Sequence, residues 1–446
     1  MISQIPQGEL EAIVAAYGVS EAEWQTLSLA LKDLAIAEIA AQLEISEVTV
    51  RKRLGEVFRK FNLGGVRPGK LTDLKQILLS ESQKRQSALP GKIVWGEAPD
   101  VSTFYGRSDE LDKLARWIVE EKCRLVALLG LRGMGKTALC VKLVEQVDSK
   151  FERVIWRSLR YAPPLDDLLA NLIPLLSHPQ KPNLPTETNQ KISLLIDCFR
   201  KHRCLIVLDS ADAILQTEEL AGRYQKGYEN YGELFRRVGE ERHQSCLLLT
   251  SLENFPEIAA LAEPKEELKS PVRTLTLTDL KLSEPEIRDF FHKKGLSELD
   301  EDRWSELIGR YRGNPLALKM AVATINEVFR GRVSTFIDQK TFVFGDISSL
   351  LKPQFDRLSA LEKKIVDLLA MEEQPISFVK LRQKLSSFYP QAPELSELIA
   401  AMQSLSRRSL LERKDTESKE VVFTLQSLVK EYARTKLSSQ TTSADD

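Results

Sequence analysis

Gly130-Leu-Arg-Gly-Met-Gly135-Lys136-Thr137 follows an apolar run and precedes a stretch that is predicted to be helical. Its pattern is G-x-x-x-x-G-K-[ST], in which the glycines let the backbone curl so that successive N–H groups face an anion. The N-terminus of the following helix adds a partial positive charge. We therefore predict a phosphate-binding loop (P-loop) in which Lys136 reaches the β- and γ-phosphates and the Thr137 hydroxyl ligates Mg²⁺. The predicted nucleotide-binding residues of this loop are Gly130, Gly133, Gly135, Lys136, Thr137 and Ala138.

A second apolar run, Cys204-Leu-Ile-Val-Leu-Asp209, ends in a carboxylate. Such a strand is the natural partner of a P-loop, because its acidic residue can hold Mg²⁺. We predict that Asp209 is the catalytic residue, which holds Mg²⁺ through water, and that Thr137 and Asp209 are the metal ligands. In hydrolysing P-loop proteins a further acidic residue polarises the attacking water, but here Ser210 follows. Asp212 lies two positions further on, and its position alone does not assign it that role.

The middle of the chain alternates short apolar runs with helical stretches, which indicates a parallel sheet covered on both faces. The predicted fold is an α/β P-loop NTPase with a five-stranded parallel sheet. An all-α helix-turn-helix domain precedes it, and helical and winged-helix domains follow it. The predicted strands are Arg124–Leu129, Arg153–Trp156, Cys204–Leu208, Ser245–Thr250 and Val272–Leu277.

Changes in this pattern predict the domain boundaries. A polar stretch with Pro and Gly follows the N-terminal helices and is typical of a linker. Near the C-terminus, helices are followed by two β-like runs, Leu410–Lys414 and Glu420–Thr424, as in a winged helix. The predicted domains are a helix-turn-helix domain at 1–80, a linker at 81–100, the nucleotide-binding domain at 101–280, a small helical domain at 281–350, the winged helix at 351–437 and a disordered tail at 438–446.

The composition is that of an ordinary soluble protein, with 446 residues, 43% hydrophobic and 28% charged residues, and a formal net charge of -1. This balance argues against a globally basic nucleic-acid coat. The N-terminus lacks a positive segment followed by an apolar one, and no apolar run is long enough to span a bilayer. We therefore expect a cytoplasmic protein without a membrane partner, whose five scattered cysteines are buried free thiols.

From about Trp95 to Lys436 the chain resembles the NB-ARC module of the STAND signalling ATPases, in the form found in cyanobacterial proteins that often continue into WD40 repeats. The resemblance implies that Arg107 packs at the adenine end of the nucleotide. It also implies that Thr250 and Ser251 sense the γ-phosphate and that Pro315 presses on the base. The segments that carry the resemblance are the P-loop, the Asp209 strand, Phe104-Tyr-Gly-Arg-Ser-Asp-Glu110, Val154-Ile-Trp-Arg-Ser-Leu159, Ser245-Cys-Leu-Leu-Leu-Thr-Ser251, Gly313-Asn-Pro-Leu316 and Phe423-Thr-Leu-Gln426.

Three positions depart from the family pattern. Leu252 replaces the arginine that usually follows Thr-Ser, Ser210 replaces the second acid, and Gln426-Ser427 replaces a His-Asp pair that closes the winged helix over ADP. The first two changes weaken charge stabilisation and water activation in the transition state. We expect binding of ADP or ATP with Mg²⁺ to survive and hydrolysis to be slow at most.

Val19 to Asp73 resembles a LuxR-type helix-turn-helix. The carrying residues are Ala37-Glu-Ile-Ala40, Leu43-Glu-Ile-Ser46, Thr49-Val50, Arg51-Lys-Arg53 and Arg59-Lys60-Phe61. Ser46 would cap the recognition helix, and a basic exposed face can contact phosphates in the major groove. Over residues 1–90, however, basic and acidic residues balance, so DNA and protein partners both remain open. The predicted DNA-binding residues are Thr49, Arg51, Lys52 and Arg53.

Three functions fit these observations. The first is a signalling switch in which exchange of ADP for ATP opens the domains, permits self-association into a homo-oligomer and activates the N-terminal module. The second is a DNA-binding transcriptional regulator whose nucleotide domain is degenerate. The third, a fast hydrolysing ATPase, is disfavoured by Leu252 and Ser210.

Overall fold

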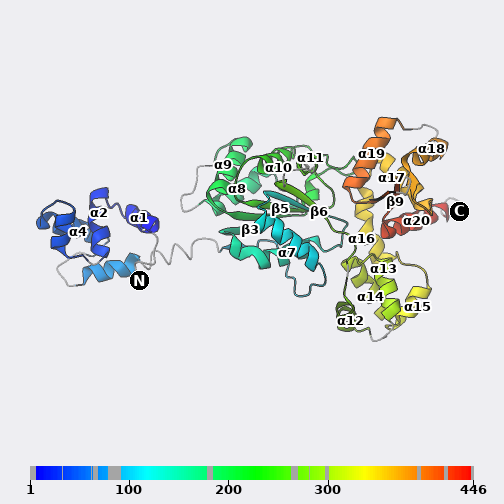
Figure 1. Ribbon diagram of the computed structural model, residues 1–446, viewed down its shortest axis with the longest axis horizontal. Coiled ribbons are helices and arrows are strands. Elements are labelled where there is room, and N and C mark those ends of the chain that lie inside the picture. Colours follow the sequence, from blue (N-terminus) through cyan, green and yellow to red (C-terminus); the bar gives the residue numbers. More distant parts are fainter. Residues whose placement is uncertain are drawn as a thin grey trace. The chain divides into compact units, whose positions relative to one another are not determined.

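The computed structural model describes residues 7–32, 34–61, 63, 69–78, 92–177, 184–262, 270–280, 282–296, 301–388, 393–415 and 420–442. The chain forms two compact units, Met1–Gly91 and Lys92–Asp446, and each is described by itself (Figure 1). Among the described residues, no helix has both the length and the apolar character needed to cross a bilayer.

The N-terminal unit is helical, as predicted. Its apolar side chains, among them Leu27, Ile39 and Val57, form one buried cluster. Ser46 accepts a hydrogen bond from the Thr49 backbone N–H at 3.2 Å and so caps the helix that the sequence predicted as the recognition helix. The helices are α1 (Gln7–Ala16), α2 (Glu21–Leu31), α3 (Ile36–Gln42) and α4 (Glu47–Lys60).

The second unit is built on a parallel sheet with the order β1-β3-β4-β5-β2-β6. The five predicted strands are all present, but the predicted strand number is wrong, because a sixth strand lies at the edge. This strand, β1, pairs Ile93 with Val154 and belongs to the segment that was predicted to be a linker. Residues 81–91 of that segment lie outside the described residues. The strands are β1 (Ile93–Val94), β2 (Leu125–Leu129), β3 (Arg153–Ser158), β4 (Cys204–Asp209), β5 (Cys246–Ser251) and β6 (Val272–Thr276).

Helices cover both faces of this sheet, so alternate residues of each strand enter different cores. Leu125 and Ala127 pack with α8, α9 and α10, whereas Val126 and Leu128 pack with α6 and α7. All five cysteines are buried and none of them forms a disulfide, as expected. The covering helices are α6 (Ser108–Ala115), α7 (Lys136–Val147), α8 (Leu165–Leu176), α9 (Thr188–Lys201), α10 (Asn230–Glu240) and α11 (Pro256–Leu261).

Short helices follow the sheet and lead into the winged helix. Helix α16 crosses the boundary predicted at residues 350 and 351, so the two C-terminal domains share one continuous helix. The helices are α12 (Glu284–Lys293), α13 (Glu301–Arg310), α14 (Pro315–Phe329), α15 (Val333–Asp338) and α16 (Gly345–Asp356).

The C-terminal region contains a three-stranded sheet with the order β7-β9-β8, packed with helices as in a winged helix. Helix α20 continues to Thr442, into the tail that was predicted to be disordered from residue 438. The rest of that tail lies outside the described residues. The elements are α17 (Ala360–Met371), β7 (Ile376–Ser377), α18 (Phe378–Phe388), α19 (Leu395–Arg407), β8 (Leu411–Asp415), β9 (Val421–Leu425) and α20 (Ser427–Thr442).

Candidate nucleotide-binding site

The P-loop connects the end of β2 to the start of α7 at the carboxyl edge of the sheet. Gly135 is the N-cap of α7 and has a φ of 87°, in the left-handed region that favours glycine. Gly133 has a φ of 83°, and a Cβ placed on it would lie 2.6 Å from Asn314 Oδ1. The loop therefore needs glycine at both positions, once for the turn into the helix and once for close approach of a neighbouring segment.

Lys136 lies over the same loop. Its ammonium donates to the carbonyl oxygens of Gly130 at 2.8 Å and Leu131 at 3.0 Å. Burial lowers the pKa of Lys136 to about 8, and the negative charges of Asp212 and Asp209 partly oppose that shift. The side chain therefore titrates close to neutral pH, unlike a solvated lysine.

This pKa predicts that nucleotide affinity falls as the pH rises. The phosphates attract the protonated ammonium, which predominates below about pH 8 and is lost above it. One pH unit above the pKa, affinity should be roughly tenfold lower than at neutral pH. Titration of fluorescent ADP at several pH values measures this. Lys136→Arg, whose guanidinium stays charged, should give a flat profile. A constant wild-type affinity across the range would contradict the prediction.

One carboxylate joins a helix and two strands of the site. Asp209, which is 3% exposed at the end of β4, accepts hydrogen bonds on Oδ1 from the Thr137 hydroxyl at 2.8 Å and the Thr250 hydroxyl at 2.7 Å. Thr137 lies in the first turn of α7 and Thr250 lies in β5, so elements that are far apart in sequence meet at one oxygen. A hydroxyl and a carboxylate side by side are hard oxygen ligands, which suit Mg²⁺.

The other predicted sensor residue, Ser251, is turned away from this cluster. Its hydroxyl donates to the Glu253 carbonyl at 2.6 Å and accepts from the Glu253 N–H, so it stabilises the loop after β5. Asp212 takes a place that the sequence did not assign. Its Oδ1 accepts from the Leu252 N–H at 3.1 Å, and its charge acts on Lys136. The available signal was a second acid three residues after Asp209.

A cavity of about 210 Å³ opens beside the P-loop. Its lining is mostly apolar, as expected for the base of a nucleotide. It brings together Arg107, Gly135, Ala138 and Pro315, four of the residues that were predicted to contact the nucleotide. Phe104 and Leu318 are among its other lining residues.

Arg107 is buried at the edge of this cavity, with 6% of the residue exposed. Its guanidinium donates to Glu110 at 2.6 Å and to the Thr278 carbonyl at 2.7 Å. The side chain thus ties the start of α6 to the segment after β6. Its charge is paired with that of Glu110 within the protein.

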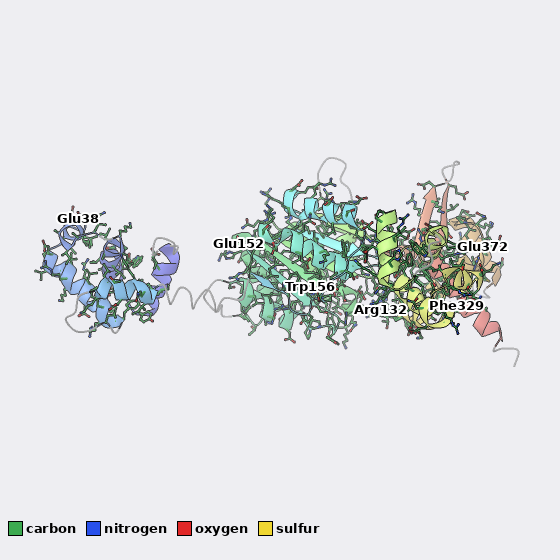
Figure 2. All side chains as sticks on the ribbon, turned by 90° about the horizontal axis from the view of Figure 1, so that it is seen from below. Glu38, Arg132, Glu152, Trp156, Phe329 and Glu372 are labelled. Carbon is green, nitrogen blue, oxygen red and sulfur yellow. The ribbon has the colours of Figure 1, made fainter. Side chains whose placement is uncertain are left out.

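The loop before α14 closes the site from the other side. Asn314 caps α14 and donates through Nδ2 to the Arg132 carbonyl at 2.9 Å. The Leu316 N–H donates to the Gly133 carbonyl at 3.3 Å. In Figure 2, Arg132 lies where the sheet domain meets the small helical domain. Asn314 is therefore a site residue that the sequence analysis missed, although it lies within the Gly313-Asn-Pro motif.

The four predicted DNA-binding residues have different surroundings in the N-terminal unit. Arg51 and Lys52 are exposed on α4, and Arg51 pairs with Glu47 at 2.7 Å. Arg53 instead donates to the Ala22 carbonyl and to Thr26 on α2. Thr49 bonds to the capping Ser46. Three of the four side chains thus make contacts within the helical module, and Arg51 and Lys52 are the two that stay exposed.

These features define a P-loop ATPase fold that continues into a small helical domain and a winged helix. Residues 107–221 match the family model described as "NB-ARC domain", and residues 18–67 match "Bacterial regulatory proteins, luxR family". Residues 107–221 are thus similar to an NB-ARC domain, and residues 18–67 are similar to a LuxR-type helix-turn-helix, as the sequence predicted.

One relative and two solved structures complete the comparison. The chain is 39% identical over 438 residues to an uncharacterized WD repeat-containing protein of Nostoc sp. (strain PCC 7120), a match that covers 96% of this chain but only 33% of the relative. A Walker-type ATPase of Pyrococcus abyssi has the same fold, with a TM-score of 0.51, 15% identity and coverage of 74% of this chain and 96% of that one. A STAND protein with a tetratricopeptide repeat sensor from Pyrococcus horikoshii gives a TM-score of 0.37, 18% identity and coverage of 76% and 43%.

Proposed function

We propose that this protein is a signalling switch that binds ADP or ATP with Mg²⁺, changes conformation on nucleotide exchange and controls its N-terminal helix-turn-helix. The observation that carries this proposal is the meeting of Thr137 and Thr250 at one oxygen of Asp209. A ligand that separates these three groups would change the packing of α7, β4 and β5 together.

The residues of the site fit a magnesium nucleotide. The N–H groups of the P-loop and the ammonium of Lys136 would bind the phosphates, and Thr137 with Asp209 would hold the ion. The apolar cavity beside Pro315 would receive the base. Thr250 lies next to the ion ligands and would respond to a γ-phosphate that ADP lacks. Mg²⁺ supplies charge neutralisation for the phosphates when it is bound.

Slow hydrolysis is part of this proposal. Leu252 offers no positive charge to the γ-phosphate, and its N–H holds the Asp212 carboxylate at 3.1 Å. That hydrogen bond ties the Asp212 carboxylate to the segment after β5. The free energy of nucleotide binding would therefore shift the conformational equilibrium of the protein more than it would accelerate hydrolysis.

Nucleotide-dependent assembly tests the switch. With ADP we expect a monomer, because ADP would bridge the P-loop and Pro315 without a γ-phosphate beside Thr250. With a non-hydrolysable ATP analogue we expect a larger mass, since only a ligand with different affinity for the two states can shift them. Light scattering measures the mass in each case, and Lys136→Ala should abolish the difference. Equal masses with both nucleotides would count against the switch.

DNA is the partner we propose for the helix-turn-helix, because Arg51 and Lys52 remain exposed on α4. Reversing both charges to glutamate should strongly weaken DNA retardation by the full-length protein. It should also lower the slope of log affinity against log salt by about 2, since two phosphate contacts are lost. Lys32→Glu, an exposed residue after α2, is the matched control. Retardation that is unchanged by the double reversal would instead favour a protein partner.

A further inference from the structure

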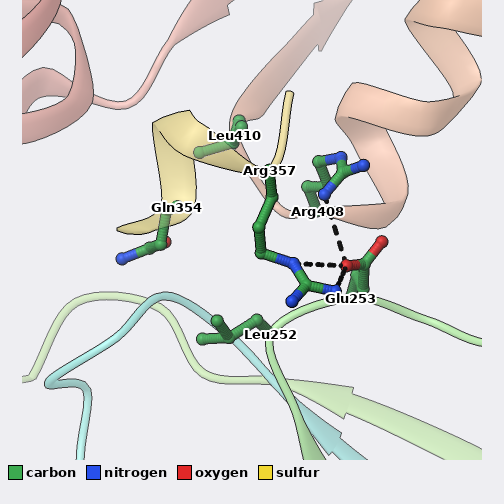
Figure 3. Close-up of a pocket in the computed structure, with 6 residues that line it drawn as sticks. All are labelled: Leu252, Glu253, Gln354, Arg357, Arg408 and Leu410. Atoms are coloured by element: carbon green, nitrogen blue, oxygen red, sulfur yellow. Dashed lines mark hydrogen bonds and ion pairs between the residues drawn. The ribbon is translucent and has the colours of Figure 1, made fainter. Parts of the chain in front are cut away.

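A buried ion cluster joins the sheet domain to the winged helix. Glu253 follows β5 directly, and its side chain is 1% exposed. Its Oε1 accepts from Arg357 Nε at 2.8 Å and Nη2 at 2.5 Å, and from Arg408 Nη1 at 3.3 Å (Figure 3). Arg357 follows α16 and Arg408 follows α19, so one carboxylate of the sheet domain binds two cations from the C-terminal region.

The second carboxylate of this cluster lies on α17. Glu362 Oε1 accepts from Arg408 Nε at 3.1 Å and from the Ser404 hydroxyl at 2.6 Å. The cluster thus has two negative and two positive side chains and no net charge, all in a region largely shielded from water. If the two domains separate, Glu253 leaves with one negative charge, and Arg357, Arg408 and Glu362 keep one positive charge.

Main-chain hydrogen bonds surround the cluster and depend on the same packing. The Glu218 N–H donates to the Arg357 carbonyl at 3.0 Å, and the Asn254 N–H donates to the Arg407 carbonyl at 3.0 Å. The Ala221 N–H donates to the Ser404 hydroxyl at 2.6 Å. These three amides belong to the sheet domain, and their acceptors belong to the C-terminal region. They therefore report directly on whether the two are in contact.

The cluster also touches the loops that carry the phosphate site. Arg357 Nη2 donates to the Asp212 carbonyl at 3.1 Å, and the Leu252 N–H binds the Asp212 carboxylate. Both loops follow strands that hold groups of the Asp209 cluster. A shift of Arg357 is thus transmitted to β4 and β5 through hydrogen bonds that are already in place.

We propose that Glu253, Arg357, Arg408 and Glu362 form an ionic latch that holds the winged helix closed on the sheet domain without requiring a nucleotide. The desolvation of such a quartet nearly offsets its internal attraction, whereas removing one member leaves an unpaired buried charge. The four side chains therefore favour one arrangement of the two domains, while the small net stabilisation of the cluster allows the domains to separate again. The latch rests on the proposed switch for its purpose. It would hold the winged helix on the sheet domain in a chain that has Gln426-Ser427 at the position of the His-Asp pair that the resemblance implies.

Hydrogen exchange of the full-length protein without added nucleotide tests the latch. Glu253→Gln leaves a net positive charge in the closed state, so the amides of Glu218, Ala221 and Asn254 should exchange at least about tenfold faster. Peptides from Leu125–Leu129 should not change, because β2 is paired on both sides within the sheet. Glu233→Gln, which removes an exposed partner of Arg236 on α10, is the control and should leave all these rates unchanged.

Two further variants keep the test decisive. Arg357→Gln changes only the C-terminal side of the cluster, and it should also accelerate exchange of the three amides. It therefore tests the latch even where Glu253→Gln disturbs the folding of the sheet domain. Combining Glu253→Gln with Arg357→Gln removes one charge of each sign and should slow exchange relative to either single change. Unchanged exchange in both single variants, or additive acceleration in the double variant, would overturn the latch. Failure of the wild type to bind ADP would refute the switch but would not alter these exchange rates.

Discussion

Replacing Lys136 by alanine is expected to weaken ADP and ATP binding by at least about 100-fold, since hydrogen bonds to charged groups contribute about 1.5–3 kcal/mol each. In the structure its ammonium donates to two carbonyl oxygens of the P-loop, and a bound phosphate offers it an anion instead. Alanine has high helix propensity and fits the start of α7 without strain. The fold should therefore survive, with a melting temperature within a few degrees of the wild type.

Isothermal titration with each nucleotide measures the loss. Lys142→Ala is the matched control, because it removes a lysine from the same helix where the side chain pairs with Glu145 at 2.8 Å. That variant should bind like the wild type. Wild-type affinity in Lys136→Ala would show that the P-loop does not hold the phosphates.

Gly133→Ala is expected to have the second-largest effect. A Cβ there would lie 2.6 Å from Asn314 Oδ1 and 2.9 Å from Leu316 Cβ, so the loop before α14 must move away from the P-loop. Overpacking of this kind costs about 1–3 kcal/mol, in addition to about 1–2 kcal/mol for an alanine in the left-handed region. We expect nucleotide affinity to fall roughly 10- to 100-fold through the displaced wall of the base cavity.

Gly227→Ala separates these two causes. Gly227 has a φ of 90°, close to that of Gly133, but a Cβ on it would meet nothing within 4 Å. Thermal unfolding of both variants should show the strain that they share, whereas only Gly133→Ala should lose nucleotide affinity. Equal affinities in the two variants would mean that the contact with Asn314 does not shape the site.

Sequence reasoning succeeded where the fold depends on local pattern. The β2–P-loop–α7 unit and the strand that ends in Asp209 are each contiguous, and their residue types follow from backbone geometry and apolar burial. The same patterns gave the parallel sheet with helices on both faces. The sixth strand, β1, was not predicted because it has only two residues, and its pairing with β3 depends on where the chain returns to the sheet edge.

Side-chain partners were harder to foresee, because they depend on which segments the fold brings together. Ser251 was predicted to face the γ-phosphate, yet its hydroxyl binds the loop that follows it. Arg53 was predicted to meet DNA, yet it binds α2. The roles assigned to Thr250, Pro315 and Arg107 at the nucleotide stay predictions, although all three side chains lie at or beside the proposed site.

The sequence by itself determined the P-loop motif, its acidic partner strand and the likeness of two segments to known domain families, because each is encoded in a short continuous stretch. Only the tertiary structure decided that Asp212 accepts a hydrogen bond from the segment after β5 and that Glu253 is neutralised by Arg357 and Arg408. These groups come from loops far apart in the chain. A buried charge must find a partner wherever packing supplies one, and packing between domains leaves no periodic trace in sequence.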